Sequence, residues 1–337
     1  MPQSRYVTSL PEGRLECGLC PRGCRIPPGA LGRCAVRGNR AGVGTLPYYG
    51  AITAMQVDPI EKKPLYHYHP GSRILSVGFV GCNLQCPFCQ NWHISQAGGG
   101  QRIPSRYYTP EALIHAAQAE GSGQIAYTYA EPLVHLEYLL ECMTLAREAG
   151  IANVLVSNGC ISDAGAEAVL RLTEAVNIDL KCFSEGTYTR LLQGDLAAVL
   201  AFITRAFETG VHLEVTTLVV PGLNDREEEI DRGVAFLASL SPQIPLHLSA
   251  YHPAYTWEAP ATDPLRLQAL ASRARETLAY VYTGNLPGSS QDTICPRCGR
   301  AVIRREGYRI DTSGLCPDGS CCRWCGNALP ITVFMSK

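Results

Sequence analysis

Cysteines gathered in three short groups constrain this chain of 337 residues more than any other feature. Four of the sixteen cysteines lie in 17–34, three in 82–89 and six in 295–325. In a small secreted chain such groups would indicate disulfides, whereas clustered cysteines in a larger cytosolic chain more often bind metal. The remaining three stand alone, and we interpret them as small buried hydrophobic residues.

Charge and hydropathy favour a cytoplasmic protein. A formal net charge of −1 leaves no broad basic surface, so neither a nucleic acid nor a membrane is expected as a partner. The sequence has no run of 18 apolar residues. Residues 1–16 are polar and lack the apolar core of a signal peptide. We therefore expect a reducing environment, in which the cysteine groups bind metal.

The middle of the chain, from about 73 to 283, alternates short apolar runs with stretches of helical period. The runs predict strands at Ile74–Val80, Gln124–Tyr129, Ala152–Ser157, Val176–Leu180, Leu213–Val220 and Leu246–Ala250, with a weaker seventh at Leu278–Tyr282. The helical stretches are Pro110–Glu120, Leu133–Ala149, Ala164–Thr173, Ala197–Glu208, Arg226–Leu240 and Asp263–Thr277.

Six strand–helix units predict an α/β fold with an incomplete (β/α)6 barrel of the TIM type. A doubly wound open sheet is the alternative, because periodicity alone does not distinguish the two. We expect three domains: a cysteine-rich metal-binding segment at 1–70, the barrel at 71–285 and a zinc-ribbon-like domain at 290–337. The first should contain a short hairpin near Tyr48–Val57, and the last a hairpin arm at Ala301–Ile310.

The central cysteines, Cys82, Cys86 and Cys89, directly follow the first predicted strand of the barrel. A loop with the spacing C-x3-C-x2-C can place three thiolates round one face of a cubane cluster. Such clusters usually take four thiolates, so three leave one iron open to bind a small molecule. A third zinc knuckle is the alternative interpretation.

This triplet resembles the signature of the radical S-adenosylmethionine (radical SAM) superfamily, with Phe88 at its usual aromatic position. The resemblance implies a [4Fe-4S] cluster whose open iron binds SAM. It also implies an oxidoreductase that cleaves SAM reductively to a 5′-deoxyadenosyl radical, which abstracts hydrogen from a substrate. A flavodoxin or ferredoxin is then expected as electron donor.

Later strand ends extend the resemblance towards the activating enzymes of glycyl-radical proteins, of the pyruvate formate-lyase type. The family's GGEP motif corresponds to Tyr129-Ala130-Glu131-Pro132, in which both glycines are replaced. Glu131 can alternatively cap the helix that follows it. The cofactor-binding residues implied by the resemblance are Phe88, Glu131, Ser157, Asn158, Lys181 and His252.

Three N-terminal motifs, at 19–24, 32–37 and 58–67, resemble the radical SAM proteins of the "AmmeMemoRadiSam system". This resemblance implies Memo-like and AMMECR-like partner proteins but names no substrate. The substrate is then either a protein, as in glycyl-radical activation, or a small molecule.

The outer cysteine groups predict two further metal sites. Two CxxC-Gly knuckles predict a closed tetrahedral site for zinc, or for a single iron, in the C-terminal region. Its ligands are Cys295, Cys298, Cys322 and Cys325. The N-terminal group suits either zinc or an auxiliary iron–sulfur cluster. Its ligands are Cys17, Cys20, Cys24 and Cys34.

A non-enzymatic iron–sulfur redox sensor, or a zinc-ribbon interaction module, is the alternative function. It would use the same cysteines without needing a SAM pocket. Polar residues at successive strand ends favour the enzyme, because chance would not place one at each carboxyl edge.

Overall fold

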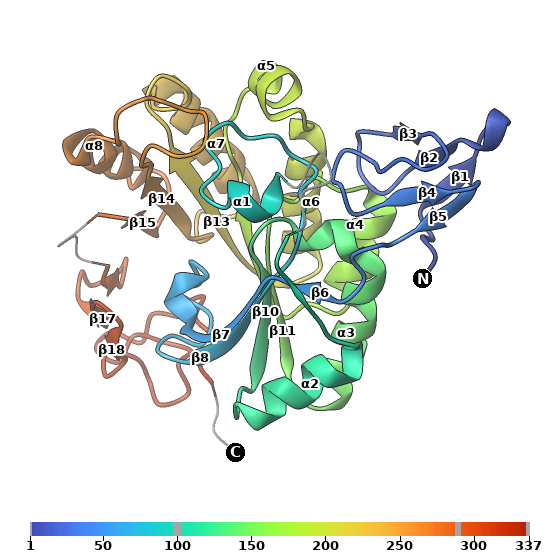
Figure 1. Cartoon of the computed structure of the whole chain (residues 1–337). Helices are drawn as coiled ribbons and strands as arrows, with labels where there is room; N and C mark the ends of the chain where they lie inside the picture. Colours follow the sequence, from blue (N-terminus) through green and yellow to red (C-terminus); the bar gives the residue numbers. More distant parts are fainter. Residues whose placement is uncertain (1, 97–102, 287–290, 335–337) are drawn as a thin grey trace.

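The computed structural model describes residues 2–96, 103–286 and 291–334. A sheet of eight strands forms its centre (Figure 1). In sheet order these strands are β15 (Val281–Gly284), β14 (Leu246–Ala250), β13 (His212–Val219), β12 (Ala175–Asp179), β11 (Ala152–Ser157), β10 (Gln124–Thr128), β8 (Arg73–Gly78) and β7 (Ala54–Pro59). All neighbours pair in parallel except β7, which is antiparallel to β8 at one edge.

The strand order decides between the two predicted α/β folds. The parallel strands lie in the sheet in the order in which they occur in the chain. Right-handed crossovers then place every connecting helix on the same face, whereas a doubly wound sheet reverses its order at one point. The incomplete barrel is therefore confirmed, and β15 adds a seventh parallel strand. The helices are α2 (Pro110–Ala119), α3 (Leu136–Glu148), α4 (Asp163–Leu170), α6 (Leu196–Glu208), α7 (Glu227–Leu240) and α8 (Pro264–Ala274).

The helices follow from their apolar period and their caps. In α6 the buried positions Leu196, Val199, Ile203 and Ala206 recur at three- and four-residue intervals, which forms one stripe facing the sheet. α2 begins at Pro110, where the Thr109 side chain accepts a hydrogen bond from the Ala112 N–H. None of the helices in the described part is long and apolar enough to cross a membrane.

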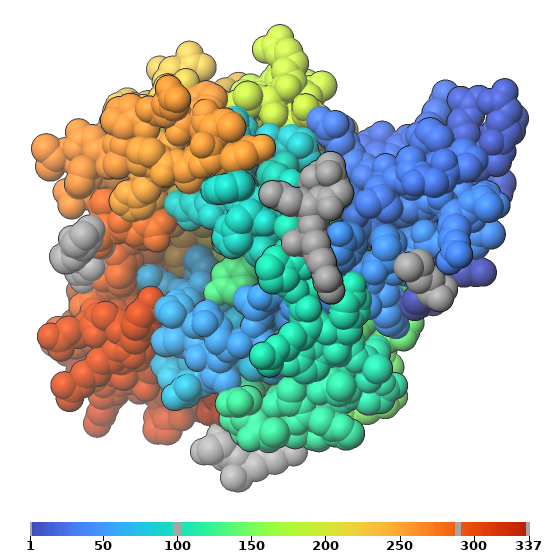
Figure 2. Space-filling model, viewed as in Figure 1, coloured from blue at the N-terminus to red at the C-terminus, as the bar shows by residue number. Residues whose placement is uncertain are grey.

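The N-terminal segment forms a lobe at the side of the barrel, beyond α4 and α6 (Figures 1 and 2). It contains a three-stranded sheet of β1 (Val7–Ser9), β2 (Leu15–Cys17) and β3 (Cys24–Ile26), and a hairpin of β4 (Gly38–Arg40) and β5 (Val43–Thr45). The predicted hairpin near Tyr48–Val57 is wrong. β6 (Ala51–Ile52) pairs with β9 (Arg106–Tyr107), and β7 pairs with β8, because the barrel edge offers unpaired backbone groups that β7 satisfies.

A buried ion pair fastens this lobe to the barrel. The Arg37 guanidinium donates to both carboxylate oxygens of Glu137 on α3, at 2.8 and 2.6 Å, and both side chains are almost fully buried. Glu137 also accepts from the Arg5 backbone N–H at 2.8 Å. Such a bidentate pair fixes orientation as well as position.

The amino ends of the strands are closed by the chain itself. Ile60, Leu65 and Tyr68 pack against the inner faces of β8, β10, β11 and β12, so they fill the lower part of the barrel. On β13, the fully buried Glu214 accepts from the backbone N–H groups of Tyr66 and His67. The open end of the barrel is therefore the end at which the strands finish.

The C-terminal region folds as the predicted hairpin arm, β17 (Ala301–Glu306) with β18 (Arg309–Asp311), and β16 (Thr293–Ile294) adds a short third strand. It rests beside β7 and β8 (Figure 1). The Arg305 guanidinium donates to the Tyr66 carbonyl at 2.6 Å and lies 4.5 Å from the centre of that ring, which docks the region onto the barrel.

The Arg37–Glu137 pair yields a stability prediction. Glu137→Ala should lower the free energy of unfolding by about 3–5 kcal/mol, because it leaves the Arg37 charge buried without its partner. Urea unfolding measures the change. The control is Glu167→Ala, which removes an exposed ion pair with Arg171 and should cost less than about 1 kcal/mol. Equal losses in the two variants would contradict a specific role for the buried pair.

Candidate active site

A cavity of about 290 Å³ opens at the carboxyl ends of the parallel strands, near the lower end of the size range of small-molecule sites. It receives side chains from every parallel strand end and from the segment before β8. Its polar lining comprises Lys62, Cys82, Cys86, Cys89, Gln90, Asn91, Ser95, Gln96, Thr128, Tyr129, Glu131, Ser157, Asn158, Asp179, Lys181, Thr216, Ser249 and Asn285. All of the predicted cluster and SAM-binding residues except His252 therefore line this one cavity.

The three central cysteines lie together in the loop after β8, and all are free thiols. Cys82 and Cys86 are buried and Cys89 is half-buried. Cys82 Sγ accepts from the Leu84 N–H at 3.3 Å and from the Asn158 amide at 3.7 Å. Burial raises the pKa of Cys86 to about 12, although Lys181 opposes the shift, so Cys86 is a thiol that iron binding would deprotonate.

This donor set fits the implied cluster. Three thiols on one side of a shared cavity can each bind a different iron, and the cavity leaves room beside the fourth. Amide and backbone N–H groups directed at Cys82 Sγ are the kind of hydrogen bonds that tune thiolate-bound iron. Cys82, Cys86 and Cys89 would hold the cluster here.

Glu131 caps a helix and also joins two strand ends. Its carboxylate accepts from the Leu133 N–H at 3.0 Å, at the start of the 3-10 helix η3 (Pro132–His135). It accepts from Ser157 Oγ at 2.7 Å and from the Asn158 N–H at 2.9 Å, both at the end of β11. Burial raises its pKa to about 7, while these hydrogen bonds act in the opposite direction. The capping interpretation is thus what the structure shows, in a residue that also lines the cavity.

The backbone before Glu131 adopts a conformation that favours glycine, although neither residue there is a glycine. Tyr129 and Ala130 have φ values of +50° and +54°, in the left-handed region that favours glycine. Lys63 donates to the Tyr129 hydroxyl at 3.0 Å, and its ammonium lies 4.5 Å from the ring centre. The buried Asp58 carboxylate in turn accepts from Lys63 at 3.0 Å. A charged pair from the N-terminal segment therefore holds a strained turn at the cavity wall.

Lys181 stands at the end of β12 and reaches the cavity. Its ammonium lies 2.8 Å from Asp179 Oδ2, and the side chain is 19% exposed. Burial disfavours the charged form, but the carboxylate of Asp179 outweighs it and raises the pKa of Lys181. The residue is thus a permanent cation beside Cys86, suited to a carboxylate ligand.

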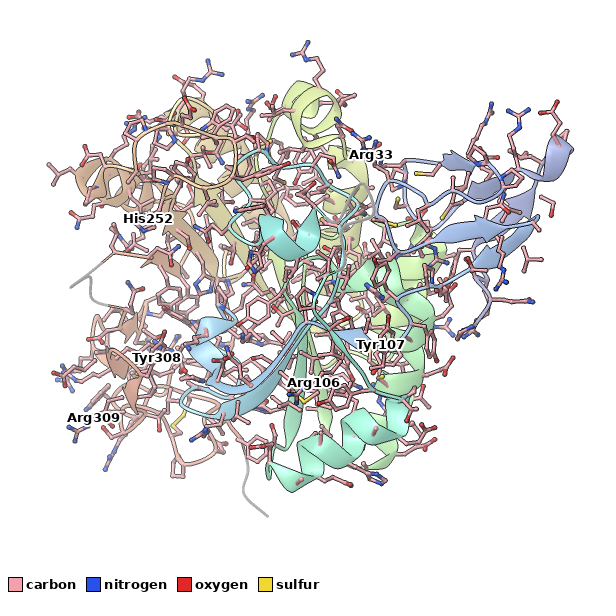
Figure 3. The ribbon with its side chains drawn as sticks, in the orientation of Figure 1. Arg33, Arg106, Tyr107, His252, Tyr308 and Arg309 are labelled. Atoms are coloured by element: carbon pink, nitrogen blue, oxygen red, sulfur yellow. A yellow bond between two sulfur atoms is a disulfide. The ribbon has the colours of Figure 1, made fainter. Side chains whose placement is uncertain are left out.

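Of the two remaining predicted cofactor-binding residues, one lines the cavity and the other does not. Phe88 is buried, lines the cavity and packs edge-on to Trp257. His252 is exposed and is not among the lining residues; Figure 3 places it on the outside of the barrel. The preceding Tyr251 turns inward and donates to the Trp257 carbonyl at 2.6 Å, which leaves His252 facing outward. The structure therefore does not bring His252 to the site.

Ser249 and Asn285 line the cavity at the ends of β14 and β15 but were not predicted. Ser249 was detectable, because it precedes the end of a predicted strand by one residue. Asn285 follows the weakest predicted strand. Lys62 reaches the site from the N-terminal segment, a placement that strand periodicity does not reveal.

The C-terminal cysteines converge as a single metal site. The Sγ atoms of Cys295, Cys298, Cys322 and Cys325 lie within 4.8 Å of one another, with two pairs at 3.7 Å. A tetrahedral zinc site with Zn–S bonds of 2.3 Å requires edges of about 3.8 Å. Cys316 and Cys321 form a disulfide beside this site, so they do not compete as ligands. The N-terminal cysteines line a separate small cavity.

Comparison with known proteins agrees with this geometry. The family model of the Radical SAM superfamily matches residues 76–232. An uncharacterized protein of Methanocaldococcus jannaschii is 34% identical, with 99% of this chain and all of that protein covered. Pyruvate formate-lyase 1-activating enzyme of Escherichia coli is 23% identical, with 63% of this chain and 87% of the enzyme covered.

Among solved structures, a radical SAM methyltransferase from Sphaerobacter thermophilus matches with a TM-score of 0.50 and 16% identity, over 65% of this chain and 68% of that one. SuiB of Streptococcus suis, bound to precursor peptide SuiA, matches with a TM-score of 0.51 and 14% identity, over 68% of this chain and about half (52%) of SuiB. These likenesses concern the fold. The superfamily model that matches 76–232, together with the cysteine triplet after the first barrel strand, shows that the chain belongs to the radical SAM superfamily and is related to the pyruvate formate-lyase activating enzymes.

Proposed function

We propose that this protein is a radical SAM oxidoreductase that uses a [4Fe-4S] cluster on Cys82, Cys86 and Cys89. The observation that carries the proposal is the convergence of three free thiols and a set of polar strand ends on one cavity. When bound, the cluster supplies one electron that cleaves SAM and yields a radical able to abstract hydrogen. A redox sensor would need the thiols but not the polar side chains at the strand ends, so these side chains favour the enzyme.

The residues of this chain would orient SAM and keep water out. Lys181, whose ammonium is held by Asp179, would bind the carboxylate of the methionine part. The peptide carbonyls of the Tyr129–Ala130 turn offer acceptors for its ammonium group, because any residue supplies a carbonyl. Ser157 donates a hydrogen bond to Glu131, which fixes the positions of both side chains in the cavity wall. Phe88 and Leu84 cover the loop from within the core.

The relatives of this chain support a proposal for the class of substrate. Relationship to activating enzymes supports hydrogen abstraction from a partner protein, with a small molecule as the alternative. The N-terminal motifs support Memo-like and AMMECR-like proteins as partners. Of these motifs, 58–67 supplies the Asp58–Lys63 pair beneath the Tyr129 turn, so this part of the resemblance reaches the cavity wall.

The N-terminal lobe supports an acidic electron donor such as a flavodoxin or ferredoxin. Residues 1–46 carry seven arginines and two glutamates, in a chain whose net charge is −1. Arg25 and Arg33 are both exposed on this lobe. Complementary charge mainly speeds encounter between redox partners.

The first prediction concerns the reaction itself. Anaerobically reconstituted protein with dithionite should convert SAM to 5′-deoxyadenosine and methionine, measured by liquid chromatography. Lys181→Ala should reduce this activity through a raised KM for SAM, because it removes the cation at the cavity. Absence of cleavage by protein carrying a full cluster would reject the enzymatic proposal.

A second prediction separates the metal sites. Cys86→Ala should abolish SAM cleavage and leave the C-terminal metal bound, because the C-terminal cysteines form a separate tetrahedral site. Metal analysis of the purified variant tests this expectation. Loss of the C-terminal metal together with the activity would show that the two sites depend on each other.

A third prediction concerns the donor surface. Arg25→Glu/Arg33→Glu should slow SAM cleavage driven by reduced flavodoxin about tenfold at low salt, and the difference should shrink as salt screens the charges. Cleavage driven by dithionite should not change. The matched control, Arg304→Glu/Arg309→Glu, reverses two exposed charges of the C-terminal region, and Figure 3 shows Arg309 on the opposite side of the molecule from Arg33. Equal effects of both variants would reject a donor site on the N-terminal lobe.

A further inference from the structure

We infer that Cys17, Cys20, Cys24 and Cys34 hold a second iron–sulfur cluster, not zinc, directly against the loop that binds the first. This inference goes beyond the proposed function, since these cysteines take no part in binding SAM. It rests on their convergence, their spacing and the wall that they share with the first cysteine loop.

The N-terminal fold brings the four cysteines together. Cys17 and Cys24 are directly opposite each other in the β2–β3 pair. Cys20 lies in the turn between these strands, and Cys34 comes from the loop before β4. All four are free thiols that line one cavity, with Cys17 and Cys34 buried and the other two half-buried. Four cysteines from three places thus line one small cavity, which indicates a shared metal centre.

Sulfur spacing separates this site from the C-terminal one. The distances between the C-terminal Sγ atoms are close to the edge length of a zinc tetrahedron. Among the described residues, no three of the N-terminal Sγ atoms lie within 4.8 Å of one another. In a cluster each thiolate binds a different iron, so its sulfurs stand farther apart than round a single ion. The wider N-terminal set therefore suits several metal atoms.

The first cysteine loop contributes to the wall of this cavity and touches its ligands. Asn83, next to the cluster ligand Cys82, lines the N-terminal cavity. Gly81 has φ +81° and touches the Cys34 carbonyl so closely that a Cβ would collide with it. The Asn83 amide oxygen accepts from Asn158 at 2.9 Å, and the same Asn158 amide reaches Cys82 Sγ at 3.7 Å.

Residues 81–83 would therefore connect the two metal centres. The Cys34 backbone carbonyl lies against Gly81, and the neighbouring Cys82 would hold the first cluster. Two reduced clusters held this close would couple magnetically, whereas a closed-shell zinc ion would not couple to a cluster.

Reconstitution of the full chain with iron and sulfide tests the inference. The variant Cys82→Ala/Cys86→Ala/Cys89→Ala should retain about half of the wild-type iron and acid-labile sulfide, held by the N-terminal site. Cys20→Ala/Cys24→Ala should also retain about half, held by the first site. Cys142→Ala, which removes a buried cysteine in α3, should retain the wild-type content. After reduction, the electron paramagnetic resonance signal of the wild type should be broadened relative to each variant.

The opposing result is equally specific. A triple variant that contains no iron or sulfide, but two zinc ions per chain, would overturn the inference. If Cys20→Ala/Cys24→Ala proves insoluble, the triple variant decides alone. This result is independent of SAM cleavage, which is judged on the wild type, so failure of the proposed function and failure of the second cluster are distinguishable.

Discussion

The direction and order of the parallel strands are the constraint on which the rest of this structure depends. From β8 to β15 the strands lie in the sheet in chain order. Every carboxyl end therefore opens at the same edge, and every loop that follows a strand reaches the same mouth. The cysteine loop after β8, Glu131 after β10 and Lys181 after β12 become neighbours for this reason alone. Such residues are up to a hundred positions apart in the chain.

The opposite end of the barrel shows why only one mouth remains. Residues 60–68 fill the lower interior with apolar side chains, and Glu214 ties their backbone to β13. Four hydrogen bonds satisfy this buried carboxylate, two from backbone N–H groups and two involving His212 and His247. A buried charge is tolerable only with such complete pairing. Residues 60–68 also place Lys62 and Pro64 at the cavity, so the segment that closes one end of the barrel helps to build the site at the other.

The Tyr129–Ala130 turn shows how a site tolerates an altered motif. Two consecutive non-glycine residues in the left-handed region cost about 1 kcal/mol each or more. Lys63, which is paired with Asp58, lies over the Tyr129 ring and donates to its hydroxyl. These contacts offset part of the cost. Two residues that are not glycine adopt this conformation, because tertiary contacts can maintain a backbone that the local sequence disfavours.

Local pattern was enough to predict much of this protein. The strands and helices of the barrel follow from apolar runs, helical period and caps, which are properties of neighbouring residues. The cysteine triplet after the first strand and the polar strand ends were predictable for the same reason. Periodicity did not distinguish the barrel from a doubly wound sheet, because that choice depends on which strands pair. Pairing also overturned the hairpin near Tyr48–Val57, since β7 satisfies the open edge of β8. The outward turn of His252, the arrival of Lys62 and the contact of Cys34 with Gly81 depend on packing between segments distant in the chain, and only the folded structure determines them.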